Sequence, residues 1–584
     1  MACIFITQLL SISGLACKDI IACGDATAGE YNLLMKVRDP SRPGLQVLCR
    51  VPQNYSYTYH HPWMGANITF QTNHSYIGVT SKDDIPPSIV KSGMVLTDAG
   101  LAFGDADSQS RWINPTRFAW DDFDWIRYAC EQANTTSQAV SLLTHDAIDR
   151  LHATGVSENL LVVGPEDGYF IEADAFRYTI KTIDDGVDVI SNYPRDLWKT
   201  QIVRCLPKAI SFDAETNQTV EIGDTIRLTS LYGLKIVDKS KEAIQVRQVP
   251  FYSFFVYIDG KKKIITEPIT VPLHQRTTVG DYSITLMNIT STLATVRVET
   301  IERAWQDTLF DIIDERYGTI TVHDMMNWSR LQRKDMDGLR PLCEPSFRYE
   351  GVAIYSIPTV HYDVLSGGWF SASHAYATIY VPFHNCNTKV FDVYENGQAA
   401  MIAQNLSFAY NDSLLFLIEN VEEVLRFENN RLETLLFKKN FSHSTIEALV
   451  TESDCSMQQL AWITHQHLHN ISMSIQENQR DMLFEVTAQL WNHSYIHSIE
   501  SMKHIITNLS KSLTSERIYS YIIDLCVFIA KHRLTSCQIL DYSNLLAEQT
   551  FTEALTLLHS HQFNEGITKL LLAITLCESL IFQE

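Results

Sequence analysis

The stretch CKDIIACGDATAGEYNLLMKVRD, residues 17–39, places a cysteine directly before an apolar segment and a lysine near the end of a second one. Gly24 and Gly29 lie in the more polar middle, which predicts a strand, a turn and a second strand. In such a hairpin the chain returns toward its start, so Lys36 and Asp39 could meet Cys17. The stretch therefore predicts an antiparallel hairpin that begins at a cysteine.

The same strand–turn–strand pattern occurs twice more, at 93–107 (GMVLTDAGLAFGDAD) and at 159–174 (NLLVVGPEDGYFIEAD). Between these two hairpins, residues 124–151 repeat apolar side chains every three to four residues, which predicts helical structure. Repeated hairpins separated by helical segments favour a layered α+β fold.

The rest of the chain divides by pattern. Residues 208–300 contain short strand-like runs with turn residues between them and hardly any helical spacing, which predicts an inserted β-sandwich. Residues 301–410 return to a mixed pattern, with a helix at 302–318 and strands at 375–383. From 411 to 584 the spacing is almost entirely helical. We therefore expect a core made of 17–207 and 301–410, interrupted by the sandwich and followed by a helical region that packs on the core or on a second subunit.

Composition limits the classes of partner. The chain has 584 residues and a net charge of −22, and an acidic protein repels phosphate backbones, so we do not expect nucleic-acid binding. No apolar run reaches the roughly 18 residues of a membrane span. The late apolar segment 567–582 contains Lys569 and Glu578, which indicates a buried amphipathic helix instead.

Residues 1–16 resemble a secretory signal, because an apolar stretch ends with the small residues Gly14 and Ala16 before Cys17. The positively charged start of such signals is missing. A short autocatalytic propeptide, a misplaced start codon and a folded first strand are the alternatives, and the first two would leave the protein in the cytoplasm.

Asparagines in the glycosylation pattern Asn-x-Ser/Thr are numerous, at 13 of the 26 asparagines of the chain. The Ser and Thr content predicts only about four by chance. The excess favours a glycosylated protein of the secretory route or the extracellular space. The twelve cysteines include no C-x-x-C pair, so they indicate neither a zinc ribbon nor a dense disulfide scaffold.

If residues 1–16 are removed, Cys17 carries both a thiol and a free α-amine. Such an amine has an ordinary pKa of about 7.7–8.0 and can accept the thiol proton near neutral pH. A cation on the neighbouring strand, Lys36, would favour the thiolate, and Asp39 could hold the amine. A buried structural cysteine and a surface Lys36–Asp39 ion pair are the alternatives, and an oxidised Cys17–Cys23 pair would silence the thiol.

The stretch 17–40 resembles the start of the dipeptidase A family and the related secernins, which are cysteine N-terminal-nucleophile hydrolases. Cys17 matches the family nucleophile, Ala26-Thr27 the turn, and Lys36 and Asp39 the basic and acidic residues. The hairpins at 93–107 and 158–174, the strand GVDVISNYPR at 186–195 and two segments after the insertion match in the same order. The resemblance covers about 17–205 and 301–410. It implies an αββα fold, hydrolysis of small peptides or amides through an acyl-enzyme on Cys17, no cofactor, and Asn192 in the catalytic centre.

One departure concerns the oxyanion site. The family has an asparagine where this chain has Asp105, and an ionised Asp105 would repel a developing oxyanion. Either Asp105 is protonated, or backbone amides and Asn192 donate, or activity is lost. A catalytically silent binding or surface protein and an amidase acting on acylated amines therefore remain alternatives to a dipeptidase.

Two further patterns are weaker. His465 and His469 lie one helical turn apart, as metal ligands can, but no third ligand is evident and a polar helix face is the simpler interpretation. The segment WDDFDW, residues 120–125, could bind a cation, although an acid-rich helix N-terminus explains it equally well.

Overall fold

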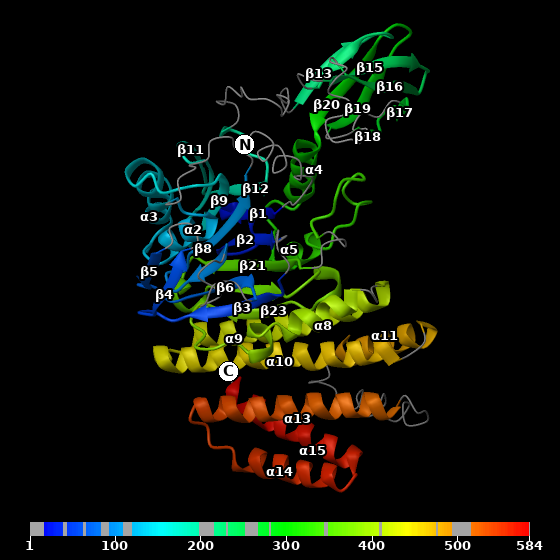
Figure 1. Ribbon diagram of the computed structural model, residues 1–584. Coiled ribbons are helices and arrows are strands. Elements are labelled where there is room, and N and C mark those ends of the chain that lie inside the picture. Colours follow the sequence, from blue (N-terminus) through cyan, green and yellow to red (C-terminus); the bar gives the residue numbers. More distant parts are fainter. Residues whose placement is uncertain are drawn as a thin grey trace.

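The computed structural model describes residues 17–38, 44–61, 66–82, 93–108, 119–197, 215–228, 232–250, 267–279, 282–343, 349–407, 411–474, 477–492 and 515–582. Two antiparallel sheets form its centre (Figure 1). The first has the order β12 (Gly186–Ser191), β1 (Lys18–Cys23), β2 (Tyr31–Arg38), β21 (Gly351–Pro358), β22 (Gly367–Ser371) and β23 (Val381–His384). The second has the order β11 (Tyr178–Ile183), β10 (Gly168–Ala173), β9 (Glu158–Val163), β8 (Ala102–Asp107), β7 (Met94–Thr97), β6 (Tyr76–Ser81) and β3 (Gln46–Val51).

The three hairpins expected from the sequence are present as β1–β2, β7–β8 and β9–β10. Strands β1 and β2 lie against β8, β9 and β10, so the two sheets face each other across a shared apolar core. Helices α4 (Ile301–Asp314) and α5 (Val322–Trp328) contact the first sheet, and α2 (Asp122–Cys130) and α3 (Thr136–Ser141) contact the second. The order of layers is helix, sheet, sheet, helix, and the expected α+β class is confirmed.

The helical character expected over 124–151 is confirmed, but the segment is not one continuous helix. It is divided into α2, α3 and a π-helix, η3 (Leu142–Arg150), with a break at residues 131–135. Thr135 accepts a hydrogen bond from the Gln138 backbone amide, and the Asn134 amide donates to the Gln138 side chain. Short polar side chains favour such caps over a continuous helix, although the apolar spacing runs through the break.

The strand expected over 375–383 is also only partly correct. Residues Ala375–Ala377 form a short 3-10 helix, η6, and β23 begins at Val381. Strands β21 and β22, which the sequence did not single out, complete the centre of the first sheet. Residues from both sides of the insertion therefore build one sheet, with β2 paired to β21 along its whole length.

The insertion forms two small sheets that lie beyond α4 (Figure 1). One contains β13 (Glu215–Val220), β20 (Ala294–Thr300), β19 (Tyr282–Ile289) and β18 (Arg276–Val279). The other contains β14 (Thr225–Arg227), β15 (Tyr232–Lys239), β16 (Ala243–Pro250) and β17 (Ile269–Pro272). They share their own apolar core, as a β-sandwich does. A further pair, β4 (Ser56–His61) and β5 (Ala66–Gln71), forms a separate hairpin.

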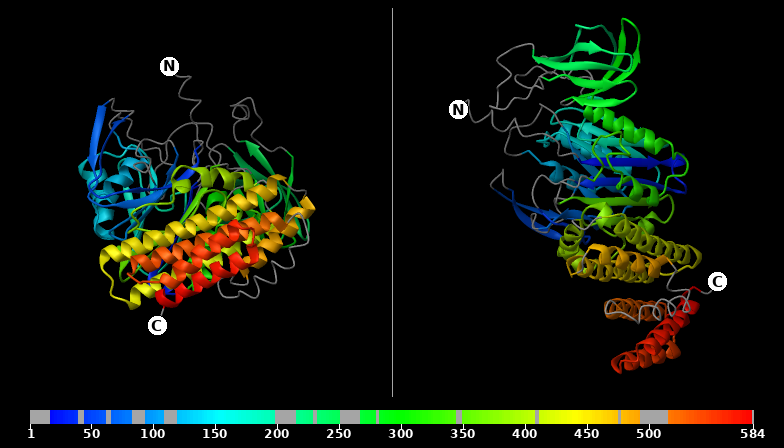
Figure 2. Two further views of the ribbon diagram at one scale, coloured as in Figure 1. Left: turned by 90° about the horizontal axis from the view of Figure 1, so that it is seen from below. Right: turned by 90° about the vertical axis from the view of Figure 1, so that its right-hand side faces the viewer.

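The C-terminal region is helical, as expected, and lies on the side of the core opposite the insertion (Figures 1 and 2). Its long helices are α8 (Gln398–Ser407), α9 (Asp412–Lys438), α10 (His443–Ser474), α11 (Glu477–Asn492), α13 (Ser515–Ile539), α14 (Leu545–His559) and α15 (Phe563–Ile581). Helix α10 contacts β23 on one side and α13 on the other. Helix α15 buries one apolar face, which confirms the amphipathic helix expected at 567–582. None of the described helices combines the length and apolarity required to cross a bilayer.

Candidate functional site

Cys17 stands directly before β1, at the end of the first sheet, and is half-buried. Strand β1 pairs on one side with β12, Lys18 opposite Ser191, and on the other with β2, Lys18 opposite Val37. If both pairings continue by one residue, Cys17 lies opposite Asn192 on one side and opposite Arg38 on the other. Side chains opposite each other, or two residues apart along a strand, share a face. Cys17, Asp19 and Lys36 therefore lie on one face of this sheet.

A buried group of charges lies on that face. The Lys36 Nζ is 3.2 Å from Asp105 Oδ1 and 3.7 Å from Asp19 Oδ1. The side chains of Lys36 and Asp19 are completely buried, and that of Asp105 is 10% exposed. Asp19 comes from β1, Lys36 from β2 and Asp105 from β8, so the group joins the two sheets.

The pKa values of this group show which members keep their protons. Burial opposes the charge on Lys36, but Asp19, Cys17 and Asp105 together hold its pKa well above the ordinary value. Burial raises the pKa of Asp19 well above its usual range, and Lys36 opposes that rise. Lys36 is therefore a fixed cation near neutral pH. It can stabilise a thiolate at Cys17 but cannot accept the thiol proton.

Asp105 pairs with Lys36, an arrangement that the sequence did not reveal. Its carboxylate accepts from a cation, so it is not directed as a donor toward an oxyanion. The close approach requires a glycine at position 93, because a Cβ there would lie 2.2 Å from Asp105 Oδ1. One signal for this role was present in the sequence: an acid stands at a position where the dipeptidase A family, which this stretch resembles, has an amide.

Asn192 follows β12, and its Nδ2 donates to the Asp107 carbonyl oxygen over 2.6 Å. An amide NH2 carries two hydrogens, so this bond leaves the second for another acceptor. The end of β12 is held by Asn159 of β9, whose buried Nδ2 donates to the Ser191 carbonyl oxygen. Asn192 thus lies at the end of β12 beside the position of Cys17. Asp39, the remaining site residue expected from the sequence, lies outside the described residues.

Two residues near the site were missed. Arg38 is buried at the end of β2, donates to Gln46 and lies over the Phe123 ring at 5.5 Å. Arg38 lies two residues after Lys36 and so on the same face of the strand, and this alternation could have identified it as a site residue.

Tyr355 of β21 is completely buried, and its hydroxyl has no hydrogen-bond partner among the described residues. Burial raises its pKa; to a smaller extent Lys36 lowers that pKa and Asp105 raises it. Its position depends on the pairing of β2 with β21, about 320 residues later, which local patterns do not predict.

The weaker sequence patterns have structural explanations. His465 is buried in α10 and its Nε2 accepts a hydrogen bond from the Ile379 amide, while His469 lies beside Asn405. The prediction of a metal-binding histidine pair is therefore wrong, and so is the prediction that His465 lies on a polar helix face.

Cys23 ends β1, about 20 Å along the strand from Cys17. A disulfide requires Cα atoms within about 7 Å, so these two cysteines cannot pair in this fold.

Comparisons with known proteins add distant similarities. No family model matches this chain, and no curated protein matches it. Among solved structures it is similar to penicillin V acylase from Agrobacterium tumefaciens, at 12% identity and a TM-score of 0.22, over 28% of this chain and 49% of that one. It is also similar to a mutant conjugated bile acid hydrolase from Clostridium perfringens, at 10% identity and a TM-score of 0.23, over 44% of this chain and 96% of that one. The chain spans about half the length of the acylase that it matches, and neither likeness carries an argument about activity.

Proposed function

We propose that the protein is a cysteine N-terminal-nucleophile amidohydrolase that cleaves small peptides, with Cys17 as its nucleophile after removal of residues 1–16. The observation that carries the proposal is the buried Lys36, held between Asp19 and Asp105 and within electrostatic reach of Cys17. A fixed buried cation beside a strand-end cysteine lowers the cost of forming a thiolate there.

The remaining steps follow from the chemistry of an N-terminal cysteine. Because Lys36 keeps its proton, the base must be another group, and the α-amine of Cys17 has a suitable pKa. It takes the thiol proton, the thiolate attacks the scissile carbonyl carbon, and the leaving amine departs with a proton as the acyl-enzyme forms. Water then adds to the thioester and releases the acid and the thiol. The second Asn192 hydrogen and backbone amides would donate to the oxyanion, and Asp39 would orient the amine.

The test combines processing, labelling and turnover. N-terminal sequencing should show a mature chain that starts at Cys17. Iodoacetamide should label Cys17 near neutral pH, whereas Cys49, also half-buried, should stay unlabelled because burial raises its pKa to about 12. Cys17→Ala should abolish hydrolysis of dipeptides, and Cys49→Ala should leave it intact. A mature chain that keeps Met1, or unchanged turnover in Cys17→Ala, would contradict the proposal.

A binding protein on the same fold is the second candidate, and Asp105 is the observation that favours it. A carboxylate next to the nucleophile could suppress oxyanion formation even when the thiol is reactive. Labelling of Cys17 without turnover of dipeptides or of N-acylated amines would select this candidate. Turnover of acylated amines alone would keep the mechanism and change the substrate class.

We also propose that the protein is glycosylated in the secretory route. Ten of the asparagines in the glycosylation pattern have described side chains, and nine of them are exposed; the tenth, Asn411, is half-buried. Exposure is what attachment of a glycan requires. Intact mass before and after enzymatic removal of N-glycans tests this. We further propose that two copies of the chain contact each other through the C-terminal helices, a proposal supported by exposed aromatic side chains on α9, namely Phe416, Phe427 and Phe437.

A further inference from the structure

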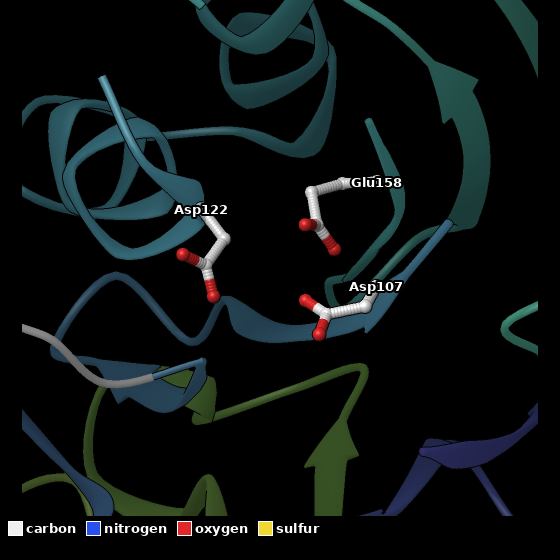
Figure 3. Close-up of side chains that lie close together, drawn as sticks. All are labelled: Asp107, Asp122 and Glu158. Carbon is white, nitrogen blue, oxygen red and sulfur yellow. The ribbon is translucent and has the colours of Figure 1, made fainter. Parts of the chain in front are cut away.

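Three carboxylates lie close together (Figure 3), and the backbone oxygen of one of them, Asp107, accepts the hydrogen bond from Asn192. Asp107 is the last residue of β8 and Glu158 the first of β9, and the two lie opposite each other in the antiparallel register. Asp122 is the first residue of α2. One oxygen of each lies within 4.8 Å of the others. Among the described residues, this is the group whose donor atoms converge as metal ligands do.

The fold places these charges together against their mutual repulsion. Like charges directly opposite each other on paired strands are destabilising, and here a third carboxylate joins them. The N-terminus of α2 favours the ionised form of Asp122 through its partial positive charge. A cation among the three oxygens would convert this repulsion into attraction.

Glu158 supplies a second, separate observation. It is only 2% exposed, and its Oε2 has no hydrogen-bond partner outside the three carboxylates among the described residues. In Figure 3 its carboxyl group points toward those of Asp107 and Asp122. A buried carboxylate oxygen without a partner is costly and requires a donor, a proton or a metal ion.

We propose that Asp107, Asp122 and Glu158 bind a hard divalent cation, with Ca2+ as the best match. Three oxygen donors favour Ca2+ or Mg2+ over zinc, which prefers nitrogen and sulfur. Two oxygens bound to one Ca2+ ion lie no more than about 4.6–5.2 Å apart, since each Ca–O distance is about 2.3–2.6 Å, and the three carboxylate oxygens, all within 4.8 Å of one another, satisfy this limit. Asp107 is exposed and Asp122 half-buried, so water can complete the coordination.

The position of the site gives the cation a structural effect on the centre. The Asp107 carbonyl oxygen accepts the hydrogen bond from Asn192, and Asp105, two residues earlier on β8, pairs with Lys36. A cation bound to the Asp107 side chain would fix the end of β8 and, through it, the orientation of Asn192. The cation therefore positions residues and takes no part in bond breaking.

The site can be tested on the full chain without any assay of activity. After treatment with EDTA, Tb3+ should bind and luminesce when tryptophan is excited, because Trp120 and Trp125 lie close to Asp122 in sequence. Ca2+ should displace it and raise the melting temperature in a saturable manner. Asp122→Asn and Glu158→Gln should each weaken binding by at least about tenfold. Asp314→Asn, an exposed acid at the end of α4, is the matched control and should bind like the wild type.

The variants also separate a metal site from a shared proton. If a cation is the natural partner, Glu158→Gln in EDTA should melt no lower than the wild type, because it removes repulsion. If Glu158 shares a proton with Asp107 instead, Glu158→Gln should melt lower and neither Ca2+ nor Mg2+ should shift the wild type, which would overturn the proposal. Binding should persist in Cys17→Ala, so failure of the cation site and failure of the proposed hydrolase are distinguishable.

Discussion

Replacing Lys36 with methionine removes the cation from the buried charge group while retaining most of the side-chain volume. Two carboxylates, Asp19 and Asp105, would then face each other between the sheets without a positive partner. At an effective dielectric constant of about 20, unit charges 3.2 Å and 3.7 Å apart attract by about 5 and about 4.5 kcal/mol. Much of this offsets the cost of desolvation, and removal of one partner from a buried pair typically costs about 3–5 kcal/mol. We expect a loss of that size near pH 7.

The loss should depend on pH. Burial raises the pKa of Asp19, and without Lys36 no cation opposes that rise, so the folded variant binds more protons than the unfolded chain. Its stability therefore falls as pH rises above the ordinary carboxyl pKa of about 4. The difference between wild type and Lys36→Met should be small near pH 4 and grow toward pH 7. Asp105→Asn in the variant background should recover part of the loss, because one buried charge is removed.

Urea unfolding followed by tryptophan fluorescence can measure this, since Trp305, Trp328 and Trp369 belong to the core between and around the sheets. Lys181→Met is the matched control: Lys181 Nζ lies 2.8 Å from Asp188 Oδ2, but its side chain is 53% exposed. Exposed pairs contribute about 0–1 kcal/mol. A loss in Lys36→Met no larger than that in Lys181→Met, or a loss that does not change with pH, would refute the reasoning.

Gly93→Ala should move Asp105 away from Lys36, because the added Cβ meets the Asp105 carboxylate. Lys36, still held protonated by Asp19, then has less negative charge beside it and should favour the Cys17 thiolate more, so labelling of Cys17 should rise. Gly104→Ala, whose Cβ finds its nearest neighbour at 3.5 Å, should change labelling little. Equal labelling in the two variants would contradict this role of Gly93. His384 gives a second pH dependence: although burial opposes its charge, Asp454 and Glu433 raise its pKa to about 10. A histidine with a raised pKa stabilises the fold fully below its unfolded pKa of about 6.5, and this contribution is lost as pH rises through about 10. The stability difference between the wild type and His384→Gln should therefore shrink between these values, and a constant difference in urea midpoints would contradict it.

Local patterns determined much of the architecture. The three hairpins, the sandwich insertion and the C-terminal helices each follow from apolar spacing and turn residues within short windows, because such signals act between near neighbours. The errors also have local causes: Asn134 and Thr135 interrupt an apolar repeat that continues beyond them. Cys17, Lys36 and Asn192 were predicted as site residues from the motifs around them, and these roles and the boundaries of the five segments stay predictions.

The sequence by itself determined that a cysteine begins a hairpin whose second strand carries a lysine, because both residues lie within one short stretch. Only the tertiary structure decided what surrounds them. The Lys36–Asp105 pair joins two sheets, Tyr355 arrives from a strand more than 300 residues later, and Asp107, Asp122 and Glu158 converge from three separate elements. These contacts depend on how sheets stack and on which strands become neighbours. They are set by burial over the whole core, which the spacing of residues within one segment does not encode.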